Sequence, residues 1–270
     1  MSKSTLLLFL LICSNIIFSQ NDLANSYAEK GRKQVIAGQY IEAVKSYDKA
    51  IAINPKSAQV FHHRGIAKAM LKNYSGAILD YNISIDLDKS DFEVYYNRGV
   101  SEYYIKDFQN AIIDFDKSIS LNSNFANSYL FRGYCNGELK YYLDALKDLN
   151  KGLVLDPTSS DGYINRAINN IVVGNNKEAL QDAEKSIQFN PSDIRGYNIR
   201  GQAKAQLKDY KGAIEDFTIV LNKDPKHLQA LFNRMATKLE LNDKQGACED
   251  YKKSLKLGEK PNSEMEAYCK

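Results

Sequence analysis

The sequence predicts an all-α fold, an α-solenoid of seven helix-turn-helix repeats with a short C-terminal capping helix. An alanine recurs every 34 residues without insertion or deletion, at Ala43, Ala77, Ala111, Ala145, Ala179, Ala213 and Ala247. A period held over seven cycles is typical of stacked identical units. Prolines share one point of this period and mark the ends of units, because proline cannot continue a helix: Pro55, Pro157, Pro191 and Pro225, with Pro261 at a further boundary.

Each period predicts two antiparallel helices. Large and small apolar side chains alternate at helical spacing, and a small residue lets two helix backbones approach closely. In residues 194–227 the first segment carries Tyr197, Gly201 and Ala205, and the second carries Ala213, Phe217 and Val220. A short polar turn with an aromatic residue is expected between the two segments, at Tyr40, Tyr74, Phe108, Tyr142 and Tyr210.

These positions resemble the tetratricopeptide repeat. With Ala43 counted as position 20 of the repeat, position 4 is mostly aromatic and proline occurs at position 32. Position 8 is small in most units: Gly31, Gly65, Gly99, Gly133, Ala167, Gly201 and Met235. The resemblance covers residues 20–261 as seven units, at 24–57, 58–91, 92–125, 126–159, 160–193, 194–227 and 228–261. It implies a right-handed superhelix, a right-handed α-solenoid whose first helices line a concave groove, and it implies no catalytic chemistry.

Residues 1–19 are expected to be a secretory signal peptide outside the repeats. A short positive start at Lys3 precedes an apolar run that ends at Phe18, too short to span a bilayer, which takes about 20 residues. We expect cleavage after Ser19 and export to the periplasm or the medium. Two alternatives stay open: a lipoprotein acylated at Cys13, although Ile12 is not the small residue that such a site needs, and an uncleaved membrane anchor.

Residues 262–270 are expected to form the capping helix, with a capping box that starts at Ser263. In the register of the repeat this helix would cover the apolar end of the stack, as repeat arrays require. In an oxidising compartment a Cys248–Cys269 disulfide would hold it there, worth about 3 kcal/mol by the chain-entropy model. The alternative is two buried thiols that never meet. Cys135 is expected to be a small packed residue, with an intermolecular disulfide as the alternative.

An arginine and an aspartate recur together in units two to seven. Position 7 is Arg64, Arg98, Arg132, Arg166, Arg200 and Arg234, and position 23 is Asp80, Asp114, Asp148, Asp182, Asp216 and Asp250. The first unit lacks both and has Lys30 and Ser46 instead. Joint presence and joint absence indicate structural ion pairs, within a helix pair or across a unit boundary. The alternative is an arginine ladder that binds anions.

The concave face predicted from the resemblance is apolar and rich in tyrosine in units two to five. Its candidate groove residues are Ile66, Met70, Tyr96, Val100, Tyr103, Tyr104, Leu130, Tyr134, Ile164, Ile168 and Ile171. Such a groove suits an extended or helical peptide with apolar anchors. Part of this set could instead pack against the next unit. The last two units are more polar, with Arg195, Asn198, Gln202, Gln206 and Glu240.

The sequence offers no catalytic motif, metal-ligand spacing or cofactor fingerprint around its histidines, His62, His63 and His227. A net charge of +3 does not favour a nucleic-acid partner. We therefore expect a non-enzymatic adaptor of the cell envelope that binds another protein or a peptide. It would take no cofactor, metal or small-molecule substrate, and it would touch a membrane only through an uncleaved signal. The alternative is a structural component of an envelope or secreted assembly that associates through its ends or convex face.

Overall fold

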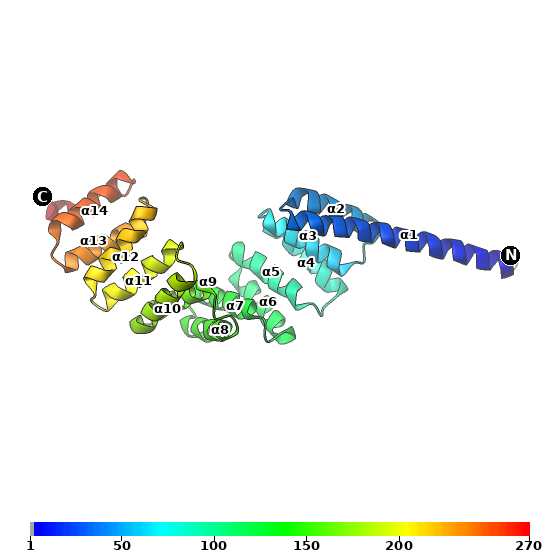
Figure 1. Ribbon diagram of the computed structural model, residues 1–270, viewed down its shortest axis with the longest axis horizontal. Helices are drawn as coiled ribbons and strands as arrows, with labels where there is room; N and C mark the ends of the chain where they lie inside the picture. Colours follow the sequence, from blue (N-terminus) through cyan, green and yellow to red (C-terminus); the bar gives the residue numbers. More distant parts are fainter. Residues whose placement is uncertain (1–2) are drawn as a thin grey trace. The chain divides into compact units, whose positions relative to one another are not determined.

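The computed structural model describes the backbone of residues 3–270 and the side chains of residues 20–270. The predicted signal peptide, residues 1–19, thus lies outside the residues with described side chains. Within residues 3–270 all regular structure is α-helical, in fifteen helices, as the sequence predicts (Figure 1). The chain divides into two compact units, residues 1–135 and 136–270.

Consecutive helices pair from α1 to α6 in the first unit and from α8 to α14 in the second. The first unit contains α1 (Lys3–Ile36), α2 (Tyr40–Ile53), α3 (Ala58–Met70), α4 (Tyr74–Leu87), α5 (Phe92–Tyr104) and α6 (Phe108–Leu121). Helix α7 (Ala126–Glu138) runs from the first unit into the second. The second unit contains α8 (Tyr142–Leu155), α9 (Ser160–Val172), α10 (Asn176–Phe189), α11 (Ile194–Gln206), α12 (Tyr210–Lys223), α13 (Leu228–Glu240), α14 (Lys244–Lys256) and α15 (Ser263–Tyr268).

The turn inside each repeat is set by one residue in the left-handed region, with φ between 57° and 87°. This residue recurs every 34 positions, at Gly38, Lys72, Lys106, Lys140, Gly174, Lys208 and Asn242. Several second helices then begin with a side-chain cap; Asn73, for example, accepts a hydrogen bond from the backbone N–H of Gly76. The aromatic residues expected in these turns lie instead at the first residue of the second helix, as Tyr74 does in α4.

The small residue at position 8 makes room for the ring at position 24. A Cβ added at Gly31, Gly65, Gly99 or Gly201 would lie 2.5–2.9 Å from the nearest ring atom of Tyr47, Tyr81, Phe115 or Phe217, respectively. The fifth repeat uses Ala167 and Ala183 at the two positions, and both are fully buried. In the four repeats with a glycine and a ring, the two positions therefore complement each other in volume, which explains why glycine at position 8 accompanies an aromatic residue at position 24.

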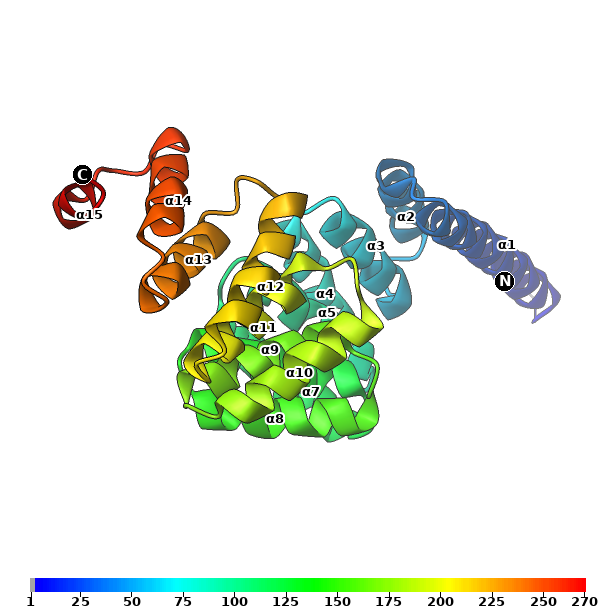
Figure 2. The same cartoon turned by 60° about the vertical axis from the view of Figure 1, so that its left-hand side comes forward.

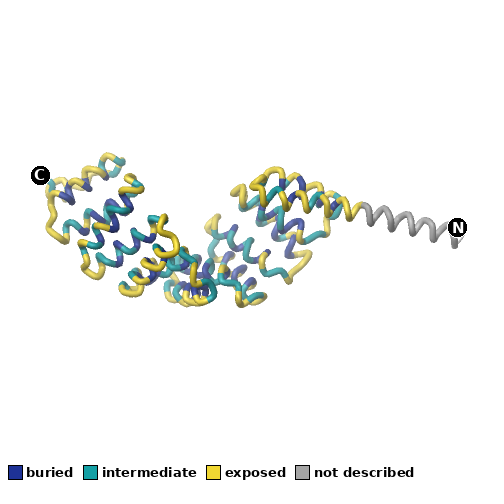
Figure 3. The backbone as a smooth tube through the Cα atoms, in the orientation of Figure 1, coloured by how far each residue is buried: buried dark blue, intermediate teal, exposed yellow. Residues whose placement is uncertain are grey.

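The first helices of neighbouring repeats also contact each other, α1 with α3 and α3 with α5 in the first unit, and α9 with α11 and α11 with α13 in the second. We call the surface that these helices present the first-helix face of each unit. Buried residues alternate with exposed ones along every pair, so the core of each unit runs between the helices (Figure 3).

Helix α15 follows an extended segment after α14 (Figure 2). Its N-cap is Asn262, whose side chain accepts from the Met265 N–H, rather than the predicted Ser263. The predicted Cys248–Cys269 disulfide is confirmed. The Tyr251 hydroxyl also bonds both the N–H and the C=O of Asn262.

Candidate functional site

The recurring arginines form bidentate ion pairs with the recurring aspartates. In the five pairs Arg64–Asp80, Arg98–Asp114, Arg166–Asp182, Arg200–Asp216 and Arg234–Asp250, Nε and Nη2 donate to the two carboxylate oxygens at 2.6–2.9 Å. These aspartates are at most 4% exposed. Each pair joins the two helices of one repeat.

The same guanidinium reaches back to the preceding repeat. Nη1 of Arg64 donates to Asp48 at 2.7 Å, and Nη1 of Arg98 donates to Asn82 at 2.7 Å. Arg132 contacts Asp116 in the same way. The aromatic ring at position 4 lies under the guanidinium, 5.3 Å from Arg64 in the case of Phe61. With these contacts occupied, the arginines link repeats, and we interpret them as structural rather than as an anion-binding ladder.

Position 11 supplies a further donor to the buried aspartate, a contact that was not predicted from the sequence. Lys68, Lys204 and Lys238 lie 2.8 Å from the carboxylates of Asp80, Asp216 and Asp250. Asn136 and Asn170 donate to Asp148 and Asp182 at 3.1 and 3.2 Å. The third repeat differs, because its position 11 is Glu102. Burial, reinforced by the Asp114 carboxylate, raises the pKa of Glu102 to about 8.

The first-helix face of the first unit contains both exposed and packed members of the predicted groove. Met70 and Tyr104 are each 54% exposed. Ile66 packs on the buried cluster around Tyr81. Tyr96, Val100 and Tyr103 pack on the next buried cluster, around Phe115. Leu130 is only 2% exposed, so it belongs to the core and is not available as a groove contact.

Aromatic rings form a connected network on this unit, with neighbouring centroids 4.9–6.0 Å apart. Its members are Tyr74, Phe92, Tyr96, Tyr103, Tyr104, Phe108, Phe115, Phe125, Phe131 and Tyr134. Tyr104 stacks on Tyr74 at 4.9 Å and also contacts Tyr103, so the network continues from the core to the surface. Four of these rings are groove residues predicted from the sequence, whereas their contacts with Phe125 and Phe131 do not follow from the sequence pattern.

His62 lies on the same unit but is 4% exposed. Its Nε2 is 2.9 Å from Asn97 Nδ2, and its Nδ1 is 3.5 Å from the Asp91 carboxylate. Burial lowers the pKa of His62 to about 4, so the ring is neutral near pH 7. A buried neutral imidazole in these contacts fits a structural hydrogen-bonding role.

The first-helix face of the second unit is more polar. Ile168 is 40% exposed, Ile171 packs on the α9–α11 core, and Ile164, at 2% exposed, is core. A pocket of about 250 Å³ opens further along this face. It is lined mainly by side-chain amides and small residues of α11 and α13: Gln202, Ala205, Gln206, Gln229, Asn233 and Ala236.

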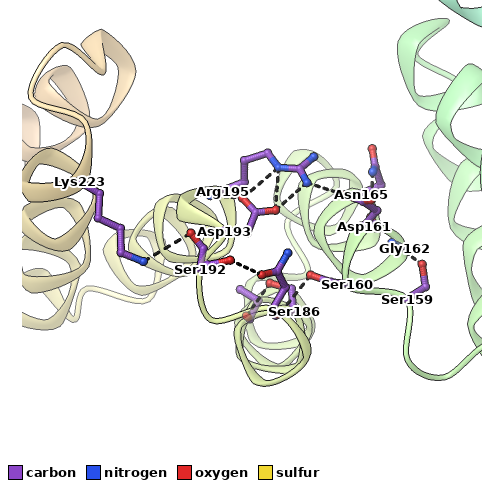
Figure 4. A network of polar contacts seen from close by, with 12 residues as sticks. Ser159, Ser160, Asp161, Gly162, Asn165, Ser186, Ser192, Asp193, Arg195 and Lys223 are labelled. Atoms are coloured by element: carbon purple, nitrogen blue, oxygen red, sulfur yellow. Dashed lines mark hydrogen bonds and ion pairs between the residues drawn. The ribbon is translucent and has the colours of Figure 1, made fainter. Parts of the chain in front are cut away.

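The charges at the start of α9 and α11 neutralise one another (Figure 4). Arg195 Nη2 lies 2.5 Å from Asp161 Oδ1 and 2.6 Å from Asp193 Oδ2. Burial opposes the ionisation of Asp193, but hydrogen bonds from Arg195 outweigh it and hold its pKa below the ordinary value. Lys223 donates to the Pro191 carbonyl at 3.2 Å. Arg195 is thus already held by two carboxylates.

Among the residues with described side chains, no helix is long and apolar enough to cross a membrane. The same residues contain no cluster of three or more His, Cys, Asp or Glu side chains placed to hold a metal ion.

Two family models match parts of the chain, a TPR repeat over residues 31–72 and a tetratricopeptide repeat over residues 92–125. No curated protein matches the sequence. Among solved structures, a tetratricopeptide repeat protein from Parabacteroides merdae is 20% identical, with a TM-score of 0.67; the match covers 92% of this chain and 98% of that one.

Two further structures share the fold. PilW, described as a type IV pilus biogenesis factor, is 15% identical with a TM-score of 0.67, over 75% of this chain and 94% of that one. YrrB, described as having an unusual peptide-binding site, is 18% identical with a TM-score of 0.59, over 70% of this chain and 97% of that one.

Proposed function

The chain is a tetratricopeptide repeat protein, and from this premise we propose that it is a non-catalytic scaffold that binds a peptide segment of another protein on its first-helix face. The peptide-binding site in the description of the similar YrrB supports this class of function.

The observation that carries the proposal is the aromatic network of the first unit, which reaches the surface at Tyr104. This ring and Met70 occupy the same repeat position in neighbouring first helices, and each is 54% exposed. An apolar surface anchored on rigid, stacked rings loses little side-chain entropy when a partner binds. Tyrosine and methionine are also adaptable contact residues. Such a surface suits a peptide with apolar anchor residues.

Two further observations support a non-catalytic, exported protein. His62 is buried and neutral near pH 7, so it is poorly placed for proton transfer with a bound substrate. The Cys248–Cys269 disulfide fits an oxidising compartment, and the expected signal peptide at residues 1–19 would deliver the chain there. We accordingly place the protein in the cell envelope or outside the cell.

The test is a crosslinking pull-down in cells with wild-type protein and a Met70→Glu, Tyr104→Glu double variant. Both side chains are largely exposed, so the variant is expected to keep its fold, which circular dichroism checks. Partners captured by the wild type and lost from the variant would support binding on the first-helix face.

The matched control is a Leu79→Glu, Ile113→Glu double variant, which places two charges on the second helices of the same unit. These residues are 64% and 63% exposed. Their exposure is also the observation that favours the alternative, a structural component that assembles through its second-helix surface. Partners lost from this control but kept by the first variant would establish the alternative and refute the proposal.

A further inference from the structure

The pocket of the second unit differs in chemistry from the aromatic surface of the first. Its residues carry no titratable group, and its polar atoms are mostly side-chain amides: Gln202, Gln206, Gln229 and Asn233. The cation on the same face, Arg195, is held by Asp161 and Asp193. A charged ligand group would lose its hydration here without gaining an opposite charge. The pocket therefore favours an uncharged ligand.

Asn233 leaves one hydrogen-bond donor unused. Its Oδ1 accepts from Gln229 Nε2 at 2.9 Å, whereas its Nδ2 is buried and has no partner within the described residues. The side-chain amides of Gln202 and Gln206 also make no hydrogen bond within that part of the chain. A buried unsatisfied donor costs about 1–3 kcal/mol. Because Asn233 Nδ2 has almost no accessible surface, an acceptor of a ligand satisfies it only once the Asn233 side chain turns toward the pocket.

The space in the pocket comes from small residues. Ala205 and Ala236 occupy positions 12 and 9, where the third repeat has Tyr103 and Val100, and the pocket extends down to the buried ring of Phe217. A volume of about 250 Å³ with an apolar floor accommodates one aliphatic side chain.

We propose that this pocket receives one aliphatic side chain of an extended, uncharged peptide segment, whose main-chain groups hydrogen-bond to the surrounding amides. A side-chain amide offers a donor and an acceptor side by side, the complement of a peptide group. An extended segment has free main-chain N–H and C=O groups, whereas a helix uses its own internally. The inference rests on the proposed function, because it names the kind of peptide that the scaffold binds.

The experiment uses a phage-displayed library of random dodecapeptides and selects those that bind the protein. The protein is purified in the form that its own cells produce. The same selection uses Ala236→Leu, which fills the pocket from an exposed position, and the control Ala52→Leu, an equally conservative change at an exposed site in α2. Thermal unfolding checks that both variants are folded. We expect uncharged peptides with a single aliphatic residue, weakened about tenfold or more by Ala236→Leu and unaffected by Ala52→Leu.

A selected peptide is then made with N-methyl groups beside its aliphatic residue, and separately with helix-favouring α-aminoisobutyrate. Both changes should weaken binding if the protein hydrogen-bonds to the main chain of an extended peptide. A charged consensus, apolar residues at helical spacing, tighter binding of the helix-favouring peptide, or no enriched peptide would each overturn the inference. Peptides that are lost with Met70→Glu, Tyr104→Glu but kept by Ala236→Leu would refute this pocket while leaving the proposed function standing.

Discussion

Gly65 illustrates how one residue of a repeat determines another. A Cβ at this position would lie 2.5 Å from Tyr81 Cε1, and the ring is 1% exposed, so it has no room to move away. We expect Gly65→Ala to lower the free energy of unfolding by about 1–3 kcal/mol, the usual cost of overpacking. Urea unfolding of the variant beside the wild type measures it.

The control comes from the fifth repeat, which has Ala167 and Ala183 at these two positions. In a Tyr81→Ala background, Gly65→Ala should cost little, because the ring that it would meet is gone. A double-mutant cycle should then give a coupling energy about as large as the single-variant effect. If the two substitutions instead lower the free energy of unfolding additively, a clash with Tyr81 is not the reason for the glycine at position 65.

Glu102 should give the protein a pH dependence of its own. Burial and the Asp114 carboxylate raise its pKa from 4.5 to about 8 against the opposing effect of Arg98, and Asp107 adds to the rise. The folded chain therefore holds a proton that the unfolded chain releases. The contribution of Glu102 to the free energy of unfolding is fully present below pH 4.5. It falls as the pH rises toward 8, by at most about 1.4 kcal/mol per pH unit.

Denaturant unfolding across this pH range, with Glu102→Gln as the reference, measures the difference. Glu102→Lys should also remove the fall and stabilise the protein at pH 8, because lysine at this position bonds the aspartate in three other repeats. If the wild type loses no more stability than Glu102→Gln between pH 4.5 and 8, Glu102 holds no extra proton.

At the residue scale, recurrence decides what the sequence could predict. The arginine and aspartate pairs recur six times, so their partnership was visible in the sequence. The role of Glu102 was not, because a single glutamate does not tell which side chain it faces. Lys68, Lys204 and Lys238 at the same position carried a signal that could have found it.

At the scale of helices, the buried bidentate ion pairs should contribute more to the free energy of unfolding than exposed ion pairs do. Arg166→Ala would leave Asp182, 4% exposed, as a buried charge whose one remaining partner among the described side chains is Asn170. We expect a loss of about 3–5 kcal/mol in the free energy of unfolding. Arg195→Ala is the matched control, since this arginine is more than half exposed and its loss should cost about 1 kcal/mol or less. Equal losses in chemical unfolding would mean that burial does not set the value of these pairs.

Helix α15 should depend on its disulfide. It has six residues and none of them is buried, and so short a helix is not stable alone. Cys269→Ser removes a cross-link worth about 3 kcal/mol and leaves Tyr251 to hold the segment. Amide hydrogen exchange should then rise sharply over residues 263–268 but not in α9. Unchanged protection of α15 would mean that its other contacts suffice.

At the scale of the whole molecule, the period predicted the helical architecture but not the binding surfaces. A spacing of 34 residues places every repeat, because each helix pair must bury the same positions. The exposure of a groove residue depends on its neighbours in the next repeat. Leu130 and Ile164 therefore proved to be core, while Met70 and Tyr104, which were predicted as groove residues on the same grounds, are exposed. The amide pocket also escaped prediction, because it arises from small residues on two helices rather than from one motif.

The last prediction concerns the cellular compartment of the protein. The disulfide requires oxidation, which the cytosol opposes, and the apolar segment before Ser19 would provide export. We expect intact-mass spectrometry of the protein from its own cells to give a chain that begins at Gln20 and lacks two thiol hydrogens. A chain that begins at an acylated Cys13 would establish the lipoprotein, and a full-length chain in the membrane fraction would establish the uncleaved anchor. A full-length, reduced chain in the cytosol would contradict export altogether, and the Cys248–Cys269 bond would then play no part in stability inside the cell.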